Sequence, residues 1–316
     1  MKRILKMLSC ILCLIIITVV ACGCRKKVEQ PAESAVTSVY ATFYPLYAAT
    51  EMLIEGVADV RLNCLVQPQD GCMRDYQLSD WDLALLHTAD LIIAGGRGLE
   101  DFESILYGLG ENGPVVSAVL YNMELTEQKA VNTSEDTQSH WLDPNPHIYM
   151  QIDSMKEIVQ RAANTLILLD TENEGIYKRN LEAAQARLDE LRNEIEESLA
   201  EIRDQKVIIM NEALVYAAQE YGLKPCLFYE RESGSELYDS DLDACLRALQ
   251  KCDAKVILIE KQAPQTFCEA LEAAGYRLAR MDVLSTHSAS EGSEGYFEAH
   301  RENIQAIKAA FDYREN

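Results

Sequence analysis

One stretch limits the possible folds of this chain most strongly, and it runs over residues 171–204. Its apolar residues recur at intervals of three and four, which places them on one stripe of a helix: Tyr177, Leu181, Ala184, Leu188, Leu191, Ile195, Leu199 and Ile202. Thr171 and Glu174 are spaced as a capping box and predict the start of this helix. A continuous helix of this length would be about 50 Å long, which exceeds the width of a small domain. We therefore expect a rigid strut that joins two parts of the protein.

The sequence on each side of the strut alternates between strand and helix patterns. Strands are expected at 35–43, 60–66, 91–94 and 114–119 before it, and at 207–210, 226–229, 256–260 and 277–283 after it. Such alternation is typical of parallel sheets. The predicted fold is α/β, with two lobes of mainly parallel sheet joined by one long linking helix. Half of a coiled-coil dimer is the alternative, but the apolar repeat is shorter than about five heptads and ends directly in a strand.

The N-terminus predicts export. A charged start is followed by an apolar run at 11–20. This run is shorter than a typical transmembrane helix and is typical of a secretory signal. The run ends in Val-Val-Ala-Cys at Cys22, the order of a lipobox, in which the cysteine receives a lipid. Cys24 is a second candidate, and an ordinary cleaved signal with a chance cysteine is the alternative. We expect a protein anchored to the outer face of a membrane by lipid.

These patterns give a complete set of expected segments. Residues 1–21 are the lipoprotein signal peptide, 22–35 a tether, 36–170 the N-terminal lobe, 171–204 the linking helix and 205–316 the C-terminal lobe. The net charge of −22 argues against nucleic acid and anionic lipid as partners, because both would be repelled. It is compatible with attraction of cations.

The ten cysteines contain no zinc-ribbon pair. Cys64 and Cys72 are close enough in sequence to form a disulfide in an oxidising compartment. Cys245, Cys252 and Cys268 lie in apolar helical patterns and are expected to be buried as small hydrophobic side chains.

Ligands of open parallel sheets bind beyond the carboxyl ends of the strands. The loops of interest are therefore 67–76, 139–147, 210–213 and 282–287. Asp282 follows a strand and is expected to face the cleft, with a turn or capping role as the alternative. For His140 a ligand role and a structural role are equally expected, and His147 is expected to be exposed at a helix start that Asn145 caps. His287 and His300 are expected on the surface.

The order of several motifs resembles the zinc- and manganese-binding lipoproteins that supply ABC importers, the cluster A-I solute-binding proteins. After the lipobox come Asp75-Tyr76, Gly96-Arg97-Gly98-Leu99-Glu100, Trp141-Leu142-Asp143-Pro144, the long helix, Tyr221-Gly222-Leu223, Glu260-Lys261-Gln262 and Asp282. The resemblance covers nearly the whole mature chain. It implies a Zn²⁺ or Mn²⁺ site between two lobes, built from three histidines or similar ligands and one carboxylate, and a permease as partner.

The family's metal ligands are only partly retained. Asp282 matches the carboxylate, and His140 lies one residue from a family histidine, whose own position holds Ser139. Asn211 stands at another histidine position and is a weak ligand, with Glu212 beside it as a weak carboxylate candidate.

The remaining family histidine is replaced by Arg74, and a guanidinium cannot ligate metal. Arg74 can pair with the carboxylates of Asp282 and Glu212, or it can bind an anionic or chelated ligand. The neighbouring Tyr76 is a further cleft candidate. Cys72 either supplies a thiolate to the cleft or forms the disulfide with Cys64.

Three classes of function are compatible with these features. The first is a binding protein that delivers a transition metal to an ABC permease. The second is a protein of the same fold, or an adhesin, that has lost bare-metal binding and recognises another ligand. The third, an extracytoplasmic enzyme, is disfavoured because the sequence has no nucleophile elbow, no HExxH and no paired acid–base motif. We therefore expect no enzymatic activity.

Overall fold

The computed structural model describes residues 37–66, 76–111, 113–125, 129–131, 139–141, 145–229, 239–285, 287 and 289–312. The predicted signal peptide, lipobox and tether lie outside these residues. Residues Thr37–Asn316 form one compact unit. Among the helices in the described ranges, none is both long enough and apolar enough to cross a bilayer.

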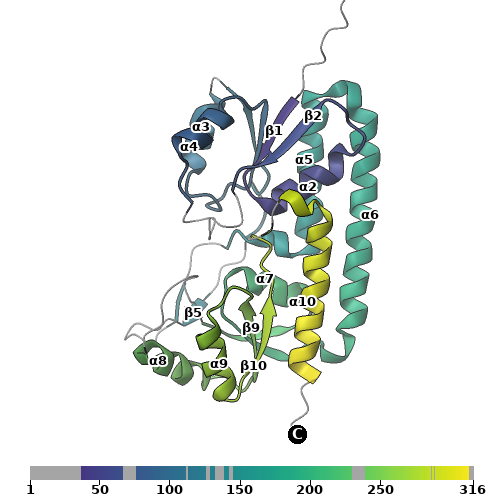
Figure 1. Ribbon diagram of the computed structural model, residues 1–316. Coiled ribbons are helices and arrows are strands. Elements are labelled where there is room, and N and C mark those ends of the chain that lie inside the picture. The colour runs from purple at the N-terminus through teal and green to yellow at the C-terminus, as the bar shows by residue number, and fades with distance from the viewer. Residues whose placement is uncertain are drawn as a thin grey trace, which may run out of the picture. The chain divides into compact units, whose positions relative to one another are not determined.

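The N-terminal half is built on a parallel sheet with the strand order β2-β1-β3-β4 (Figure 1). The central strand β3 is fully buried, as its continuous apolar sequence requires. The elements are β1 (Thr37–Ala41), α2 (Tyr44–Ile54), β2 (Val60–Cys64), α3 (Asp80–Leu86), β3 (Leu91–Ala94), α4 (Glu103–Gly110), β4 (Val115–Ala118), β5 (Lys129–Val131), β6 (Ser139–Trp141), η3 (Ile148–Met150) and α5 (Ile152–Leu169).

The C-terminal half is built on a second parallel sheet with the order β10-β9-β7-β8. The two parallel sheets and the long helix confirm the predicted fold class. The elements are η4 (Thr171–Asn173), α6 (Glu174–Ser198), η5 (Ala200–Ile202), β7 (Lys206–Ile209), α7 (Ala213–Glu220), β8 (Lys224–Phe228), α8 (Asp239–Leu249), β9 (Val256–Glu260), α9 (Gln265–Ala273), β10 (Arg277–Met281), η6 (Ala289–Glu291) and α10 (Glu294–Asp312).

The long helix α6 packs on α5 and α2 and also on α10, so it contacts elements of both halves (Figure 1). Its predicted apolar stripe is the buried face, with Tyr177, Leu188, Leu191 and Ile195 at 1% exposure or less. The α-helix proper has 25 residues and is therefore about 37 Å long, because 3₁₀ turns replace its predicted ends.

The predicted helix starts were wrong at two places. The Thr171–Glu174 capping box is replaced by Asp170, whose carboxylate accepts from the backbone N–H of Asn173. Asn145 does not cap α5, which begins at Ile152. The fully buried Asn145 side chain instead donates to the carbonyl of Glu212 at 2.8 Å, so it joins the two halves of the chain.

Helix α4 and the strands β5 and β6 were not predicted from the sequence. Helix α4 was missed because it contains Gly108 and Gly110, which have low helix propensity. Strands β5 and β6 have only three residues each and pair antiparallel with one another.

The sequence motif that ends in Glu100 forms a tight loop after β3. The buried Glu100 carboxylate accepts hydrogen bonds from the hydroxyl of Thr42 and the backbone N–H groups of Gly95 and Gly96, at 2.7, 2.7 and 2.8 Å. Burial raises the pKa of Glu100, although these hydrogen bonds oppose the shift. Gly96 has a φ of 75°, and a Cβ there would lie 3.0 Å from the Cβ of Ala118, so only glycine fits this position.

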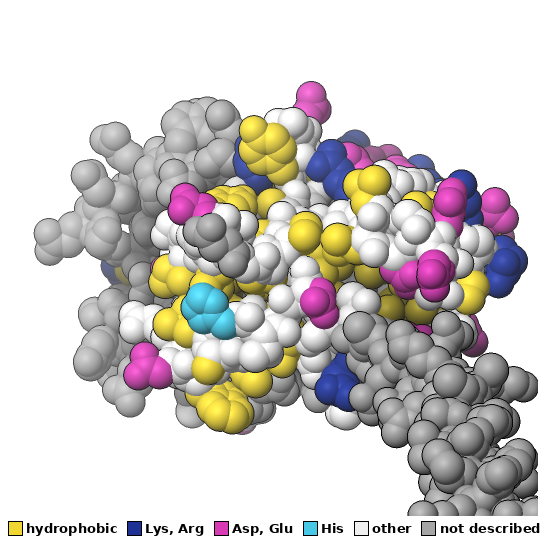
Figure 2. Space-filling model, turned by 90° about the horizontal axis from the view of Figure 1, so that it is seen from above, with side chains coloured by type: hydrophobic (Ala, Val, Ile, Leu, Met, Phe, Trp, Pro, Cys, Tyr) yellow, Lys and Arg dark blue, Asp and Glu magenta, His cyan; other side chains and the backbone are white. Residues whose placement is uncertain are grey.

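Charged side chains of both signs and hydrophobic side chains are interspersed on the face of the molecule seen in Figure 2. Single exposed hydrophobic residues are normal on soluble proteins.

Helix α10 buries a histidine that sequence analysis placed on the surface. His300 has 0% exposure, because helical spacing puts it on the same inward face as Tyr296, Asn303 and Ile307. Its Nδ1 lies 2.9 Å from the hydroxyl of Tyr221, and its Nε2 has no hydrogen-bond partner within the described part of the chain. Burial lowers the pKa of His300 to about 4.

This buried histidine predicts a loss of stability in mild acid. Between pH 6.5 and 4 the unfolded state binds a proton at this residue that the folded state refuses, so the free energy of unfolding falls as the pH falls. The loss at pH 5 relative to pH 7 is about 2 kcal/mol. Urea denaturation at both pH values, with a chelator present, measures it.

Two variants separate this contribution from that of other titrating groups. His300→Gln is expected to remove the histidine part of the pH dependence, whereas His87→Ala, at the exposed end of α3, should retain it. Equal pH dependence in His300→Gln and the unsubstituted protein would contradict the assignment.

Candidate functional site

Three adjacent strands of the C-terminal sheet end at one edge. The parallel registers of β7 with β9 and of β9 with β10 bring their carboxyl ends together. Asn211, Lys261 and Asp282 follow these strands. This is the edge at which open parallel sheets bind ligands.

Asp282 is buried and held in one position. Asn303 of α10 accepts from its backbone N–H at 2.7 Å and donates to its carbonyl at 2.9 Å. In the side chain, Oδ1 accepts from the backbone N–H of Leu284 at 2.7 Å, while Oδ2 lies 2.8 Å from His287 Nε2 and 3.3 Å from Lys261 Nζ. Burial alone would raise the pKa of Asp282, but the hydrogen bond and charge of His287 outweigh it and hold the pKa below its ordinary value.

His287 is a functional candidate that sequence analysis missed, because its side chain was expected on the surface and is only 12% exposed. Its Nδ1 lies 2.5 Å from Glu291 Oε2, and its ring stacks on Tyr44 of α2, with centroids 5.0 Å apart. Burial would lower the pKa of His287, but the hydrogen bond and charge of Asp282, aided by Glu291, raise it. In the sequence, the spacing of four residues between His287 and Glu291 was the signal that the two side chains could pair.

Lys261 was quoted in a family motif but was given no role. Its ammonium contacts Asp282 and also Glu302 of α10. The pKa of Lys261 is raised: burial lowers it, but the hydrogen bond that Lys261 donates to Glu302 and the charge of Asp282 outweigh burial. A cation therefore already lies beside the carboxylate that matches the family's metal ligand.

Asn211 and Glu212 have structural contacts at the neighbouring strand end. Asn211 Nδ2 donates to the buried Glu260 carboxylate at 2.6 Å, and Oδ1 accepts from Ala213 N at 2.9 Å, where α7 begins. The carbonyl of Glu212 accepts the hydrogen bond from Asn145. The Asn211 amide thus fixes the start of α7 and the Glu260 side chain.

The other sequence candidates are not gathered at this edge by any described contact. Tyr76 donates to Asp82 of α3 at 3.0 Å and packs edge-on against Phe102, both in the N-terminal half. His140 lies in β6, paired with Ala130, and only its backbone is described. Cys22, Cys72 and Arg74 lie outside the described residues, as does one partner of the expected Cys64–Cys72 disulfide.

His147 was expected to be exposed, but it is half-buried. Its Nδ1 lies 2.8 Å from the side-chain oxygen of Asn145, and its ring packs edge-on against Tyr149. Taken over the described ranges alone, no three or more His, Cys, Asp and Glu side chains converge as a metal-binding group.

The loop that carries His287 is tied to the N-terminal half. The hydroxyl of Tyr44 donates to the carbonyl of Gly292 at 2.7 Å, and the carboxylate of Glu51 accepts from the backbone N–H of Ser293. Both Tyr44 and Glu51 belong to α2. The candidate site is therefore coupled mechanically to both halves.

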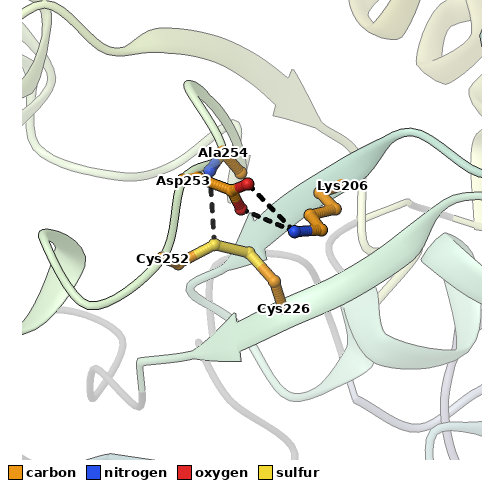
Figure 3. Close-up of a disulfide and its surroundings, with 5 residues drawn as sticks. All are labelled: Lys206, Cys226, Cys252, Asp253 and Ala254. Carbon is orange, nitrogen blue, oxygen red and sulfur yellow. Dashed lines mark hydrogen bonds and ion pairs between the residues drawn. A yellow bond between two sulfur atoms is a disulfide. The ribbon is translucent and has the colours of Figure 1, made fainter.

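The cysteines of the C-terminal half correct one expectation. Cys245 and Cys268 are buried as predicted, but Cys252 forms a disulfide with Cys226 (Figure 3). Cys226 is an extra residue in β8, since Pro225 pairs with Val207 and Leu227 with Ile208. A bulge of this kind redirects a side chain, and here it points Cys226 toward the turn after α8.

Comparisons with known proteins agree with the fold and the motif order. A family model described as "Zinc-uptake complex component A periplasmic" matches residues 39–310. The chain is 23% identical over 302 residues to the high-affinity zinc uptake system protein ZnuA of Bacillus subtilis (strain 168), covering 92% of each. It is 21% identical over 257 residues to the manganese-binding lipoprotein MntA of Halalkalibacterium halodurans, covering 80% of this chain and 81% of that protein.

Among solved structures, Zn(II)-bound AdcA from Streptococcus pneumoniae has the same fold, with a TM-score of 0.73 and 18% identity over 89% of this chain and 59% of that one. The family model spans nearly all of the described protein, from β1 to α10. The chain therefore belongs to the ZnuA family of zinc-uptake components.

Proposed function

We propose that the protein is the extracytoplasmic solute-binding component of an ABC importer and binds Zn²⁺ or Mn²⁺ between its two lobes. One observation carries the proposal most directly: Asp282 is a buried, rigidly held carboxylate at the carboxyl edge of a parallel sheet. The named relatives support the metal class, since one is a zinc-uptake protein and another a manganese-binding lipoprotein. The partner is the membrane permease of the importer.

Asp282 and His140 are the proposed ligands, because carboxylate and imidazole suit both metals. Asn211 and Glu212 are weaker candidates, since the Asn211 amide already bonds to Glu260 and to the start of α7. No part of this function requires catalysis, and the protein is proposed not to be an enzyme.

A second function is favoured by one specific contact. Lys261 Nζ lies 3.3 Å from Asp282 Oδ2 and already partly neutralises that carboxylate. A same-fold binding protein or adhesin that recognises an anionic or chelated ligand is the alternative, with Arg74 and Lys261 as the cations that attract it.

The two functions differ in metal content. The mature chain, purified without a tag, is stripped with chelator and titrated calorimetrically with Zn²⁺ and Mn²⁺, and the untreated protein is analysed for metals. Stoichiometric metal and one tight site support the first function. Absence of metal before and after titration would favour the second.

Arg74→His is expected to raise the affinity for Zn²⁺ or Mn²⁺ at least tenfold. A guanidinium about 6 Å from a divalent cation contributes roughly 5 kcal/mol of repulsion at an effective dielectric of about 20, before screening. Calorimetry compares this variant with Arg61→His, a matched change at an exposed position of β2. Unchanged affinity in Arg74→His would mean that Arg74 lies away from the metal.

Membrane attachment is proposed through a lipid on Cys22. Mass spectrometry of the mature protein is expected to find diacylglycerol on an N-terminal Cys22, and Cys22→Ala should release the protein from the membrane fraction. Cys24→Ala is the matched control and should remain attached. An unmodified mature terminus downstream of Cys24 would contradict the proposal.

A further inference from the structure

His287 occupies a position between two carboxylates that suits a metal ligand. Its Nε2 points at Asp282 Oδ2, 2.8 Å away, and its Nδ1 at Glu291 Oε2, 2.5 Å away. Metal-binding histidines usually bind with one ring nitrogen and donate the other N–H to a carboxylate, which fixes the tautomer and the ring plane. Glu291 is placed to accept from Nδ1, and Nε2 would then be the ring nitrogen that binds a metal beside Asp282.

An imidazole nitrogen and a carboxylate oxygen 2.8 Å apart are joined by a hydrogen bond. In the protein without metal, the proton of this hydrogen bond lies between Nε2 and Oδ2. A divalent metal can take its place, and the proton then leaves to solvent. Nε2 and Oδ2 are thus the pair of atoms between which the exchange occurs.

The distances are compatible with a small adjustment. Bond lengths of about 2.1 Å and tetrahedral angles place two zinc ligands roughly 3.4 Å apart. The Nε2 to Oδ2 distance must therefore increase by about 0.6 Å, which a modest rotation of the His287 ring provides. Asp282 itself is fixed by Asn303 and Leu284, so the adjustment falls on His287 and its stacking partner Tyr44.

The nearby ammonium of Lys261 does not block this arrangement. Its contact with Asp282 is 3.3 Å long, whereas its contact with Glu302 is shorter and lies at the exposed side. When a metal binds Asp282, Lys261 can stay paired with Glu302 alone. Glu302 thus gives the displaced cation a partner.

We propose that His287 is a ligand of the bound metal together with Asp282, and that Glu291 positions its ring. This proposal rests on the proposed metal-binding function and concerns which residues hold the ion. It gives this chain a histidine ligand, although Arg74 and Asn211 replace two of the family's histidines. Water completes the coordination.

The test uses the full mature chain and Co²⁺ as a spectroscopic probe, with Zn²⁺ competition to measure affinity. His287→Ala is expected to weaken binding at least tenfold, and Glu291→Gln about tenfold, as for loss of a ligand and of its orienting partner. His287→Cys should add a thiolate-to-cobalt charge-transfer band, because the new sulfur would bind the ion directly. His87→Ala and His87→Cys are the matched controls and should behave as the unsubstituted protein.

The outcomes separate this inference from the proposed function. If the unsubstituted protein binds no Co²⁺ and no Zn²⁺, the proposed function itself fails. If it binds both, but His287→Ala retains full affinity and His287→Cys gains no new band, His287 is not a ligand while the proposed function stands. Loss of affinity in His287→Ala at an unchanged melting temperature, together with a new band in His287→Cys, supports the inference.

Discussion

Asp282→Ala is expected to abolish metal binding, with a loss of affinity of at least a hundredfold. The carboxylate supplies both a ligand atom and the negative charge that balances the metal, whereas loss of a group that only orients a ligand typically costs about 10–100-fold. Removing it also leaves the Lys261 ammonium, paired with Glu302 alone, as a cation beside the site. Calorimetric titration with Zn²⁺ and Mn²⁺ measures the loss.

Because Asp282 is buried and hydrogen-bonded, the alanine variant can lose stability as well as the ligand. Asp282→Asn keeps the size of the side chain and an acceptor for Leu284, so it separates the two effects. Asp101→Ala, at an exposed position in the N-terminal half, is the matched control. Full metal affinity in folded Asp282→Asn would exclude a charged Asp282 as the anchor.

Loss of the Cys226–Cys252 disulfide is expected to lower the free energy of unfolding by roughly 3.5 kcal/mol. The bond closes a segment with a sequence separation of 26, and cross-linking such a segment restricts the unfolded chain. It joins the edge strand β8 to the turn that precedes β9. For a unit of this size the melting temperature should fall by roughly 6 °C.

The measurement compares thermal unfolding with and without reductant. Cys226 is exposed and Cys252 half-buried, so a phosphine reductant has access. The double variant Cys226→Ala with Cys252→Ala should melt at the reduced temperature under both conditions. The nearby ion pair of Lys206 and Asp253, 2.8 Å long, is largely exposed and contributes little, so Lys206→Ala is a matched control with a small effect (Figure 3). A reductant effect of the same size in the double variant would assign the loss to another group.

The periodic elements were predictable because their signals are local. The stripe from Tyr177 to Ile195 repeats at the helical period, and the continuous apolar runs of β3 and β9 suit strands buried on both faces. The ends of elements were less accurate. A polar side chain caps a helix only if no other contact holds it. Asp170 takes the capping role expected of Thr171, and Asn145 instead bonds to Glu212, 67 residues away.

Asp282 and Asn211 were predictable, because their places after strands and in the motif order could be read from the sequence. The partners of Asp282 could not. His287 is drawn inward by Asp282, Glu291 and Tyr44, and Tyr44 lies in the other half of the chain. The domain boundaries and the ligand set remain predictions.

The sequence by itself determined the α/β fold, the linking helix and the strand end that carries Asp282. The period of the hydrophobic residues and the order of the elements are local properties of the sequence. Only the tertiary structure decided which polar side chains are buried and which cysteines join. His300, His287 and the Cys226–Cys252 pair all depend on contacts between segments distant in the chain. Polar residues fit either water or a specific partner, so their burial is determined by the geometry of that partner rather than by their own hydrophobicity.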